Sequence, residues 1–117
     1  MSVPSDAPAH ELLERFGSPL FVYDADVVKR QWALLRDAMP KGSAIHYAMK
    51  ANPSLGILAL LRSLGAGVEV ASRGELEAAR RAGFPPERTL YAGPGKTPDE
   101  LEAAAIAGIA AIHAESA

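Results

Sequence analysis

Residues 46–53, His-Tyr-Ala-Met-Lys-Ala-Asn-Pro, place one lysine at the end of an apolar run. The run 44–49 predicts a buried strand, which the following Asn-Pro pair ends. Because side chains alternate along a strand, we expect His46, Ala48 and Lys50 on one face, with Lys50 over a pocket. A lysine amine can bond a carbonyl carbon when burial or neighbouring charges lower its pKa. The alternative is an exposed lysine at a strand end, without a chemical role.

From residue 44 onward the chain alternates between apolar strands and helices. The strands are predicted to begin near positions 44, 67, 89 and 110, roughly 22 residues apart, and the fourth strand is predicted over 111–115. Each of the first three is followed by a helix with clear start and stop signals. The start signals are the Asn52-Pro53 pair and the capping boxes at 72–75 and 97–100, and the stop signals are Gly65, Gly83 and Gly108.

Strands that alternate with helices at short, even spacing indicate βα units around a parallel sheet. We therefore predict an α/β fold that forms the N-terminal portion of a TIM (β/α)8 barrel, with about four of its eight units. Such a part leaves one sheet edge open, so we interpret the sequence as part of a longer protein. We expect the 117-residue chain alone to be inactive and poorly folded. A small open α/β domain is the alternative.

The N-terminal region has a different pattern. Residues 1–24 are interpreted as a lead followed by a short apolar strand at 20–23. Asp24 is placed to cap a helix predicted over 25–39. The predicted domain boundary therefore lies between residues 24 and 25, and 25–117 is the partial barrel.

The composition excludes several classes of function. The formal net charge of −2 gives no reason to expect nucleic acid or an anionic membrane as a partner. The chain has no cysteine, and its histidines at positions 10, 46 and 113 do not have metal-ligand spacing, so we expect no metal site. No apolar run approaches the length of a membrane span, so we expect a cytoplasmic protein.

Three motifs occur in a specific order and spacing. They are Tyr-Ala-Met-Lys-Ala-Asn at 47–52, Val-Glu-Val-Ala-Ser-Arg-Gly-Glu at 68–75 and Gly-Pro-Gly-Lys at 93–96. From about Ser18 to its last residue, the chain resembles the N-terminal part of the barrel-type (fold type III) pyridoxal-phosphate decarboxylases, the diaminopimelate and ornithine decarboxylase family. The resemblance implies an alanine racemase-like barrel, pyridoxal 5′-phosphate as the cofactor, and Lys50 as the residue that holds it as an internal aldimine. It also implies a homodimer whose active site is shared between subunits, and a C-terminal β-domain with which 1–24 associates.

Glu69 is the second candidate catalytic residue. Strand alternation turns Val68 and Val70 toward the helices, so Glu69 should face the barrel interior near Lys50. A charge there is costly unless it is paired. The family usually has aspartate at this position, so glutamate is a departure. The alternative is a glutamate that makes structural salt bridges inside the barrel.

Other residues near these motifs have weaker signals. His46 is a candidate for cofactor binding because it shares the predicted face of Lys50, and a buried, hydrogen-bonded histidine is the alternative. Glu75 matches a family position, but its capping box accounts for it without chemistry. The Gly-Pro-Gly-Lys turn at 93–96 resembles a phosphate cradle, and we favour a tight strand-to-helix turn instead.

The resemblance implies a carboxy-lyase that removes the carboxyl group of a small amino acid, nearest to the diaminopimelate type of lysine biosynthesis. The runner-up is a decarboxylase of secondary metabolism that acts on an amino acid tethered to a carrier protein. An amino-acid racemase and a non-catalytic carrier of pyridoxal phosphate are further alternatives. The residues that select the substrate are expected outside this chain.

Overall fold

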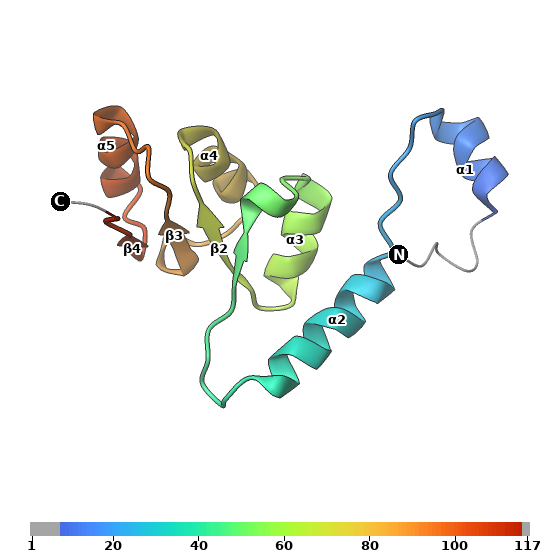
Figure 1. Cartoon of the computed structure of the whole chain (residues 1–117), viewed down its shortest axis with the longest axis horizontal. Helices are drawn as coiled ribbons and strands as arrows, with labels where there is room; N and C mark the ends of the chain where they lie inside the picture. Colours follow the sequence, from blue (N-terminus) through green and yellow to red (C-terminus); the bar gives the residue numbers. More distant parts are fainter. Residues whose placement is uncertain (1–7, 116–117) are drawn as a thin grey trace. The chain divides into compact units, whose positions relative to one another are not determined.

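A computed structural model describes residues 8–115 of the chain. The chain divides into two compact units that meet between Ala38 and Met39, and each unit is described by itself. The elements of both units are labelled in Figure 1. Residues 1–7, which belong to the predicted lead, lie outside the described range.

From residue 8 onward, the first unit contains two helices, α1 (Ala9–Phe16) and α2 (Ala25–Ala38). Asp24 caps α2 as predicted, because its carboxylate accepts hydrogen bonds from the N–H groups of Asp26 at 2.8 Å and Val27 at 3.3 Å.

The strand predicted at 20–23 is wrong, since this segment belongs to no sheet in the described part of the chain. A strand needs a partner for its N–H and C=O groups, and residues 8–115 supply none for this segment. Phe21 is 83% exposed there. The association of 1–24 with a β-domain stays a prediction.

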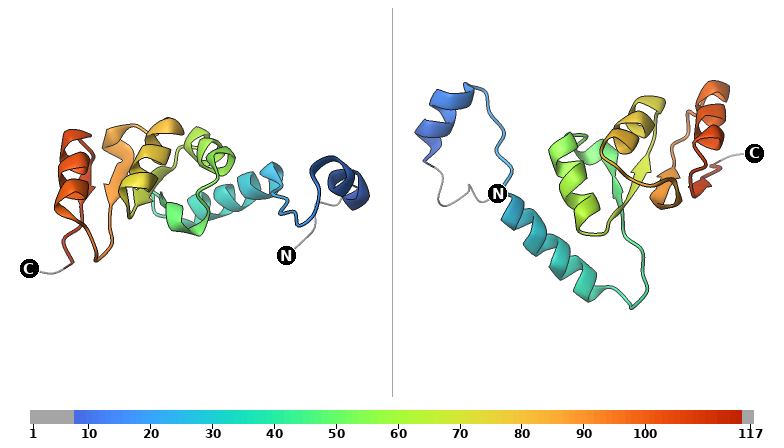
Figure 2. Two further views of the ribbon diagram at one scale, coloured as in Figure 1. Left: turned by 90° about the horizontal axis from the view of Figure 1, so that it is seen from above. Right: turned by 180° about the vertical axis from the view of Figure 1, so that it is seen from behind.

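The second unit is a parallel sheet with the strand order β1-β2-β3-β4. The strands are β1 (His46–Ala48), β2 (Gly67–Val70), β3 (Thr89–Tyr91) and β4 (Ala111–Ile112). The helices α3 (Leu55–Ser63), α4 (Arg73–Arg81) and α5 (Pro98–Ile106) connect successive strands. Short 3-10 turns are η1 (Met49–Ala51) and η2 (Pro86–Arg88). All three helices lie on one face of the sheet (Figure 2), as crossovers of a single hand between neighbouring parallel strands require. This confirms the predicted succession of βα units of a TIM barrel.

Local signals set most helix ends. The Ser72 hydroxyl accepts the N–H of Glu75 at 3.1 Å, and a full capping box joins Thr97 and Glu100 at the start of α5. The predicted stop residues Gly65, Gly83 and Gly108 all have positive φ, between 64° and 93°.

The predicted start of α3 is wrong, because the helix begins at Leu55 and not at Pro53. Instead of capping the helix, the Asn52 carboxamide oxygen accepts the N–H of Ser54 at 2.9 Å. This is an Asx turn, a local hydrogen bond that competes with a helix cap. The chain therefore turns once more before α3 begins.

The core lies between the sheet and the helices. It consists of buried apolar residues: Met49, Leu58, Val68, Val70, Ala79, Phe84, Tyr91 and Ala104. Val68 pairs with Thr89 and Val70 with Tyr91, and these four side chains form the helix-covered face. Glu69, which alternates with the two valines, is only half-buried on the other face. The predicted alternation of β2 is confirmed.

Both outer strands are shorter than predicted. The predicted strand 44–49 forms a ladder only over β1, and the strand predicted from 111 to 115 only over β4. An outer strand has one hydrogen-bonded neighbour, so its ends gain less from pairing than those of an inner strand. Both residues of β4 are exposed.

Candidate active site

A pocket of about 270 Å³ lies at the carboxyl ends of the strands. Its walls come from the strand ends, from the segments that follow them and from the first turn of α4. The lining residues are Ala48, Lys50, Glu69, Ala71, Glu75, Ala92, Gly93, Pro94 and Glu115. Parallel strands bring their carboxyl ends to one edge, which is where TIM barrels carry their active sites.

Lys50 lies in η1 and not on the strand, which corrects the predicted extent of this strand. The 3-10 turn is fixed at both sides of the lysine. Met49 is fully buried in the core, and the Tyr47 hydroxyl donates a hydrogen bond to the carbonyl of Asn52 at 3.2 Å. Lys50 itself is exposed and lines the pocket, so a rigid turn presents a reachable amine.

Glu69 lines the same pocket as Lys50, and strand register explains why. It pairs with Ala48 of β1 and Leu90 of β3, on the face opposite the helices. Within residues 8–115 its carboxylate forms no hydrogen bond or salt bridge. This part of the chain therefore supplies no partner for the alternative, a structural salt bridge.

Two further carboxylates line the pocket, and both are bound to backbone groups. Glu75 accepts the N–H of Ala71 at 2.7 Å, and Glu115 accepts the N–H of Gly93 at 2.7 Å. The capping box therefore forms only in part, because the Glu75 side chain turns to the end of β2. Sequence reasoning did not identify Glu115 as a pocket residue. The sequence marked it only as the last residue of the strand predicted over 111–115.

His46 is not brought into this pocket. It is the first residue of β1, and its ring lies so close to Gly67 that a Cβ there would meet the His46 Cδ2 at 2.3 Å. Burial and then the charge of Arg88 lower the pKa of His46, while the charge of Glu69 opposes them. His46 and Lys50 therefore lie at opposite ends of β1, and the geometry gives no support for His46 in the pocket.

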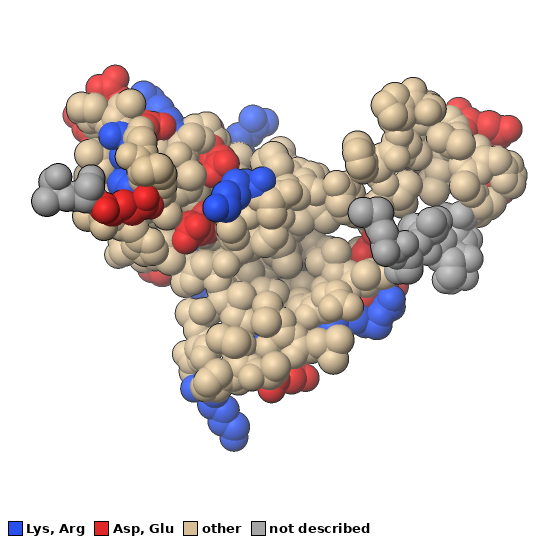
Figure 3. Space-filling view, in the orientation of Figure 1, with Lys and Arg blue, Asp and Glu red and all other residues tan. Residues whose placement is uncertain are grey.

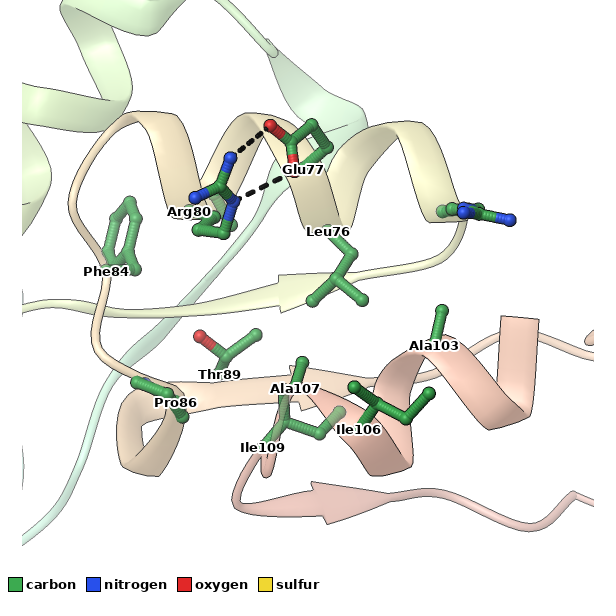
Figure 4. Close-up of a pocket in the computed structure, with 12 residues that line it drawn as sticks. Leu76, Glu77, Arg80, Phe84, Pro86, Thr89, Ala103, Ile106, Ala107 and Ile109 are labelled. Carbon is green, nitrogen blue, oxygen red and sulfur yellow. Dashed lines mark hydrogen bonds and ion pairs between the residues drawn. The ribbon is translucent and has the colours of Figure 1, made fainter. Parts of the chain in front are cut away.

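A larger cavity of about 650 Å³ lies between α4 and α5 (Figure 4). Its wall includes Phe84, Thr89 and Ile106, and Thr89 places it on the helix-covered face of the sheet. At its rim, Arg80 forms an ion pair with Glu77 at 2.8 Å. The cavity thus offers a mostly apolar wall with the Arg80–Glu77 ion pair and the side chain of Arg73, whereas the smaller pocket offers an amine and three carboxylates.

Acidic and basic side chains are interspersed on the face shown in Figure 3. Among residues 8–115, no group of side chains has the arrangement of a metal site. No helix of this part of the chain is both long and apolar enough to cross a membrane.

Comparison with known proteins gives consistent matches. Residues 25–117 match the family described as pyridoxal-dependent decarboxylase, pyridoxal binding domain. A diaminopimelate decarboxylase of Aquifex aeolicus is 44% identical over 106 residues, which cover 91% of this chain and 25% of the relative. An L-glutamyl-[BtrI acyl-carrier protein] decarboxylase of Niallia circulans is 42% identical over 105 residues, covering 90% and 24%. The chain thus spans about a quarter of the length of these relatives.

Solved structures give the same result. A crystal structure from Aquifex aeolicus superimposes with a TM-score of 0.86 at 44% identity, over 92% of this chain and 27% of that one. Diaminopimelate decarboxylase from Helicobacter pylori complexed with L-lysine superimposes with a TM-score of 0.82 at 36% identity, over 90% and 27%. The partial barrel of the second unit is therefore an arrangement already seen in solved structures.

Proposed function

The chain belongs to the pyridoxal-dependent decarboxylase family, within its pyridoxal binding domain, and we propose that the whole protein decarboxylates an amino acid with pyridoxal 5′-phosphate. One observation carries the proposal: Lys50 and Glu69 line a single pocket at the carboxyl ends of barrel strands. An exposed amine beside a carboxylate is suited to a cofactor that carries a carbonyl group.

The residues present fit one end of this cofactor. Lys50 would hold it through its amine, which the η1 turn presents to the pocket. For the phosphate end, the pocket offers few free hydrogen-bond donors and little positive charge. Two N–H groups at the strand ends, those of Ala71 and Gly93, already donate to the carboxylates of Glu75 and Glu115. Among the described residues, Lys50 is also the one cation that lines the pocket. The phosphate is therefore assigned to residues outside this chain.

When bound, pyridoxal phosphate supplies an electron sink for the electron pair that is left when the bond to the carboxyl group breaks and carbon dioxide is released. Lys50 would hold the cofactor through its amine. Glu69, which lines the same pocket, would take or return a proton at the Lys50 Nζ. Neighbouring alanines at 48, 71 and 92 leave room above the strand ends for the reacting groups.

Two substrate classes remain for this activity. The diaminopimelate type is the first candidate, and a carrier-tethered amino acid is the second. This chain is 44% identical to the relative from Aquifex aeolicus and 42% identical to the relative from Niallia circulans. That difference is too small to decide between the two substrate classes. We further propose a cytoplasmic homodimer that completes the active site across its interface, without nucleic acid or membrane as a partner.

The test is to purify the complete protein with pyridoxal phosphate and to measure carbon dioxide release. The substrates are free diaminopimelate, ornithine and lysine, and glutamate tethered to a carrier protein. Release from free diaminopimelate supports the first class, and release only from the tethered glutamate supports the second. Release only from free ornithine or lysine would support the decarboxylase but contradict both substrate classes. No release from any of them, with the cofactor bound, would contradict a decarboxylase and favour a racemase or a cofactor carrier.

A further inference from the structure

Gly93, on the rim of the Lys50 pocket, is held at both sides of its backbone. Its N–H donates to the Glu115 Oε1 at 2.7 Å, and its carbonyl accepts a hydrogen bond from the Lys96 ammonium. Both bonds involve a charged side chain, and such bonds are stronger than those between neutral groups. The Gly93 residue is therefore fixed by one carboxylate and one ammonium.

The conformation of Gly93 explains why it needs such support. Its φ is +106°, a backbone state that residues other than glycine rarely adopt. A Cβ at this position would lie 3.5 Å from the Ala71 Cβ, so space is available and the dihedral angle is the constraint. Glycine has the largest conformational freedom to lose on folding. Without these bonds the rim at Gly93 and Pro94 would sample several conformations.

The bond to Glu115 also joins two βα units, because Gly93 follows β3 and Glu115 follows β4. A second tie of the same kind occurs one unit earlier. There Glu100, in the first turn of α5, accepts the N–H of Arg73 at the start of α4, at 3.1 Å. In both places a carboxylate of the later unit accepts a backbone N–H that follows the strand of the unit before it. Of these two carboxylates, only Glu115 also lines the pocket.

We propose that Glu115 is a positioning residue of the active site. Its carboxylate fixes the Gly93 peptide, with Lys96 on the other side, and so keeps the Gly93-Pro94 rim in place beside Lys50. The inference rests on the proposed function only in taking Lys50 as the reacting amine. The loss of this bond should loosen the rim and weaken the binding of pyridoxal phosphate, without unfolding the barrel.

The test uses the complete protein and the variants Glu115→Ala, Glu115→Gln and Glu102→Ala, the last an exposed glutamate of α5 as the matched control. Hydrogen exchange of the Gly93 amide is measured in the cofactor-free protein. The affinity for pyridoxal phosphate is then measured by absorbance titration, with the melting temperature alongside. Glu115→Ala should raise the exchange rate by about tenfold, since a hydrogen bond to a charged group is lost. It should also weaken cofactor binding at a nearly unchanged melting temperature.

Glu115→Gln keeps an acceptor oxygen, so its exchange rate should rise by only about two- to fivefold. Its cofactor affinity should return toward that of the unmodified protein, and Glu102→Ala should change neither quantity. Unchanged exchange in Glu115→Ala would overturn the proposal, as would faster exchange with unchanged cofactor affinity. If Glu115→Ala does not fold, Glu115→Gln decides, and no increase in its exchange rate would overturn the proposal. Exchange needs no substrate, so a protein without decarboxylase activity contradicts the proposed function alone.

Discussion

The two faces of β2 differ in what their side chains contact. Val68 and Val70 are fully buried against the helices, while Glu69 between them lines the pocket that holds Lys50. One short strand thus contributes to the core with one face and to the candidate chemistry with the other. Substitutions on the two faces should therefore change different measurements, folding stability on one and turnover on the other.

The two cavities extend this comparison. The space between α4 and α5 is larger, about 650 Å³ against about 270 Å³. Its wall is mostly apolar, and the charges of Arg80 and Glu77 neutralise each other in an ion pair. The smaller pocket collects an exposed lysine and three carboxylates. We therefore favour the smaller pocket as the candidate site, because its ionisable groups converge, whereas volume alone would favour the larger cavity.

The largest expected effect is at Lys50. Lys50→Ala in the complete protein should lower turnover by about a thousandfold or more, the scale on which loss of a covalent residue acts. The melting temperature should barely change, because the side chain is exposed. Borohydride reduction followed by peptide mapping should place the pyridoxyl group on Lys50. A label on Lys96, or full activity in Lys50→Ala, would refute this assignment. Lys41→Ala, at an exposed lysine that does not line the pocket, is the control.

Glu69→Gln should have the next largest effect. If Glu69 moves a proton at the pocket, turnover should fall by roughly a hundredfold, as for other general acid-base residues. Stability should change little because Glu69 is half-buried and has no salt bridge within residues 8–115. Steady-state kinetics and thermal unfolding of the same preparation separate the two quantities. Normal kinetics with reduced stability would place Glu69 among structural residues and remove the contrast between the faces of β2.

Val70→Ala probes the opposite face of the same strand. It removes two buried methyl groups and leaves a small cavity, so the free energy of unfolding should fall by about 2 kcal/mol. Turnover per folded molecule should stay near normal, because Val70 faces the helices and not the pocket. Denaturant unfolding of the complete protein measures the first quantity and kinetics at low temperature the second. A large loss of turnover in the folded variant would show that the two faces are coupled.

The fold was predictable because its signals are local. Gly65 and Gly83 end helices through positive φ, and Ser72 and Thr97 begin them through side-chain bonds to the backbone. Such signals need no knowledge of distant residues. The strand predicted at 20–23 failed for the opposite reason, since a strand depends on a partner elsewhere in the structure.

The orientation of a site residue was predictable only where the alternation of side chains along one strand determines which face it occupies. Glu69 faces the pocket as its place between two valines predicts. Alternation placed His46 on the face of Lys50, but the η1 turn breaks the strand between them. The position of Glu115 depends on a hydrogen bond across two βα units, to Gly93, and no local pattern encodes a contact of that range.

The smallest expected effect concerns His46, at the opposite end of β1 from the pocket. Burial, the first cause, and the nearby charges of Arg88 and His113 lower the pKa of His46, while Glu69 opposes the shift. The folded state therefore binds the proton more weakly than the unfolded state, in which the pKa of histidine is about 6.5. Below that pH the unfolded state holds more protons, so stability falls as the pH falls.

This contribution is fully present above about pH 6.5 and is lost as the pH falls through the lowered pKa of the folded state. The melting temperature of the complete protein should consequently decrease more steeply between about pH 7 and pH 5 than that of a His46→Gln variant. Above pH 7 the two curves should run parallel, which provides the internal control. Turnover of the variant at pH 8 should stay near normal, because His46 does not line the pocket. Parallel curves down to pH 5 would show that the pKa of His46 does not differ between the folded and unfolded states. A loss of turnover at pH 8 would instead indicate that His46 contributes to the active site.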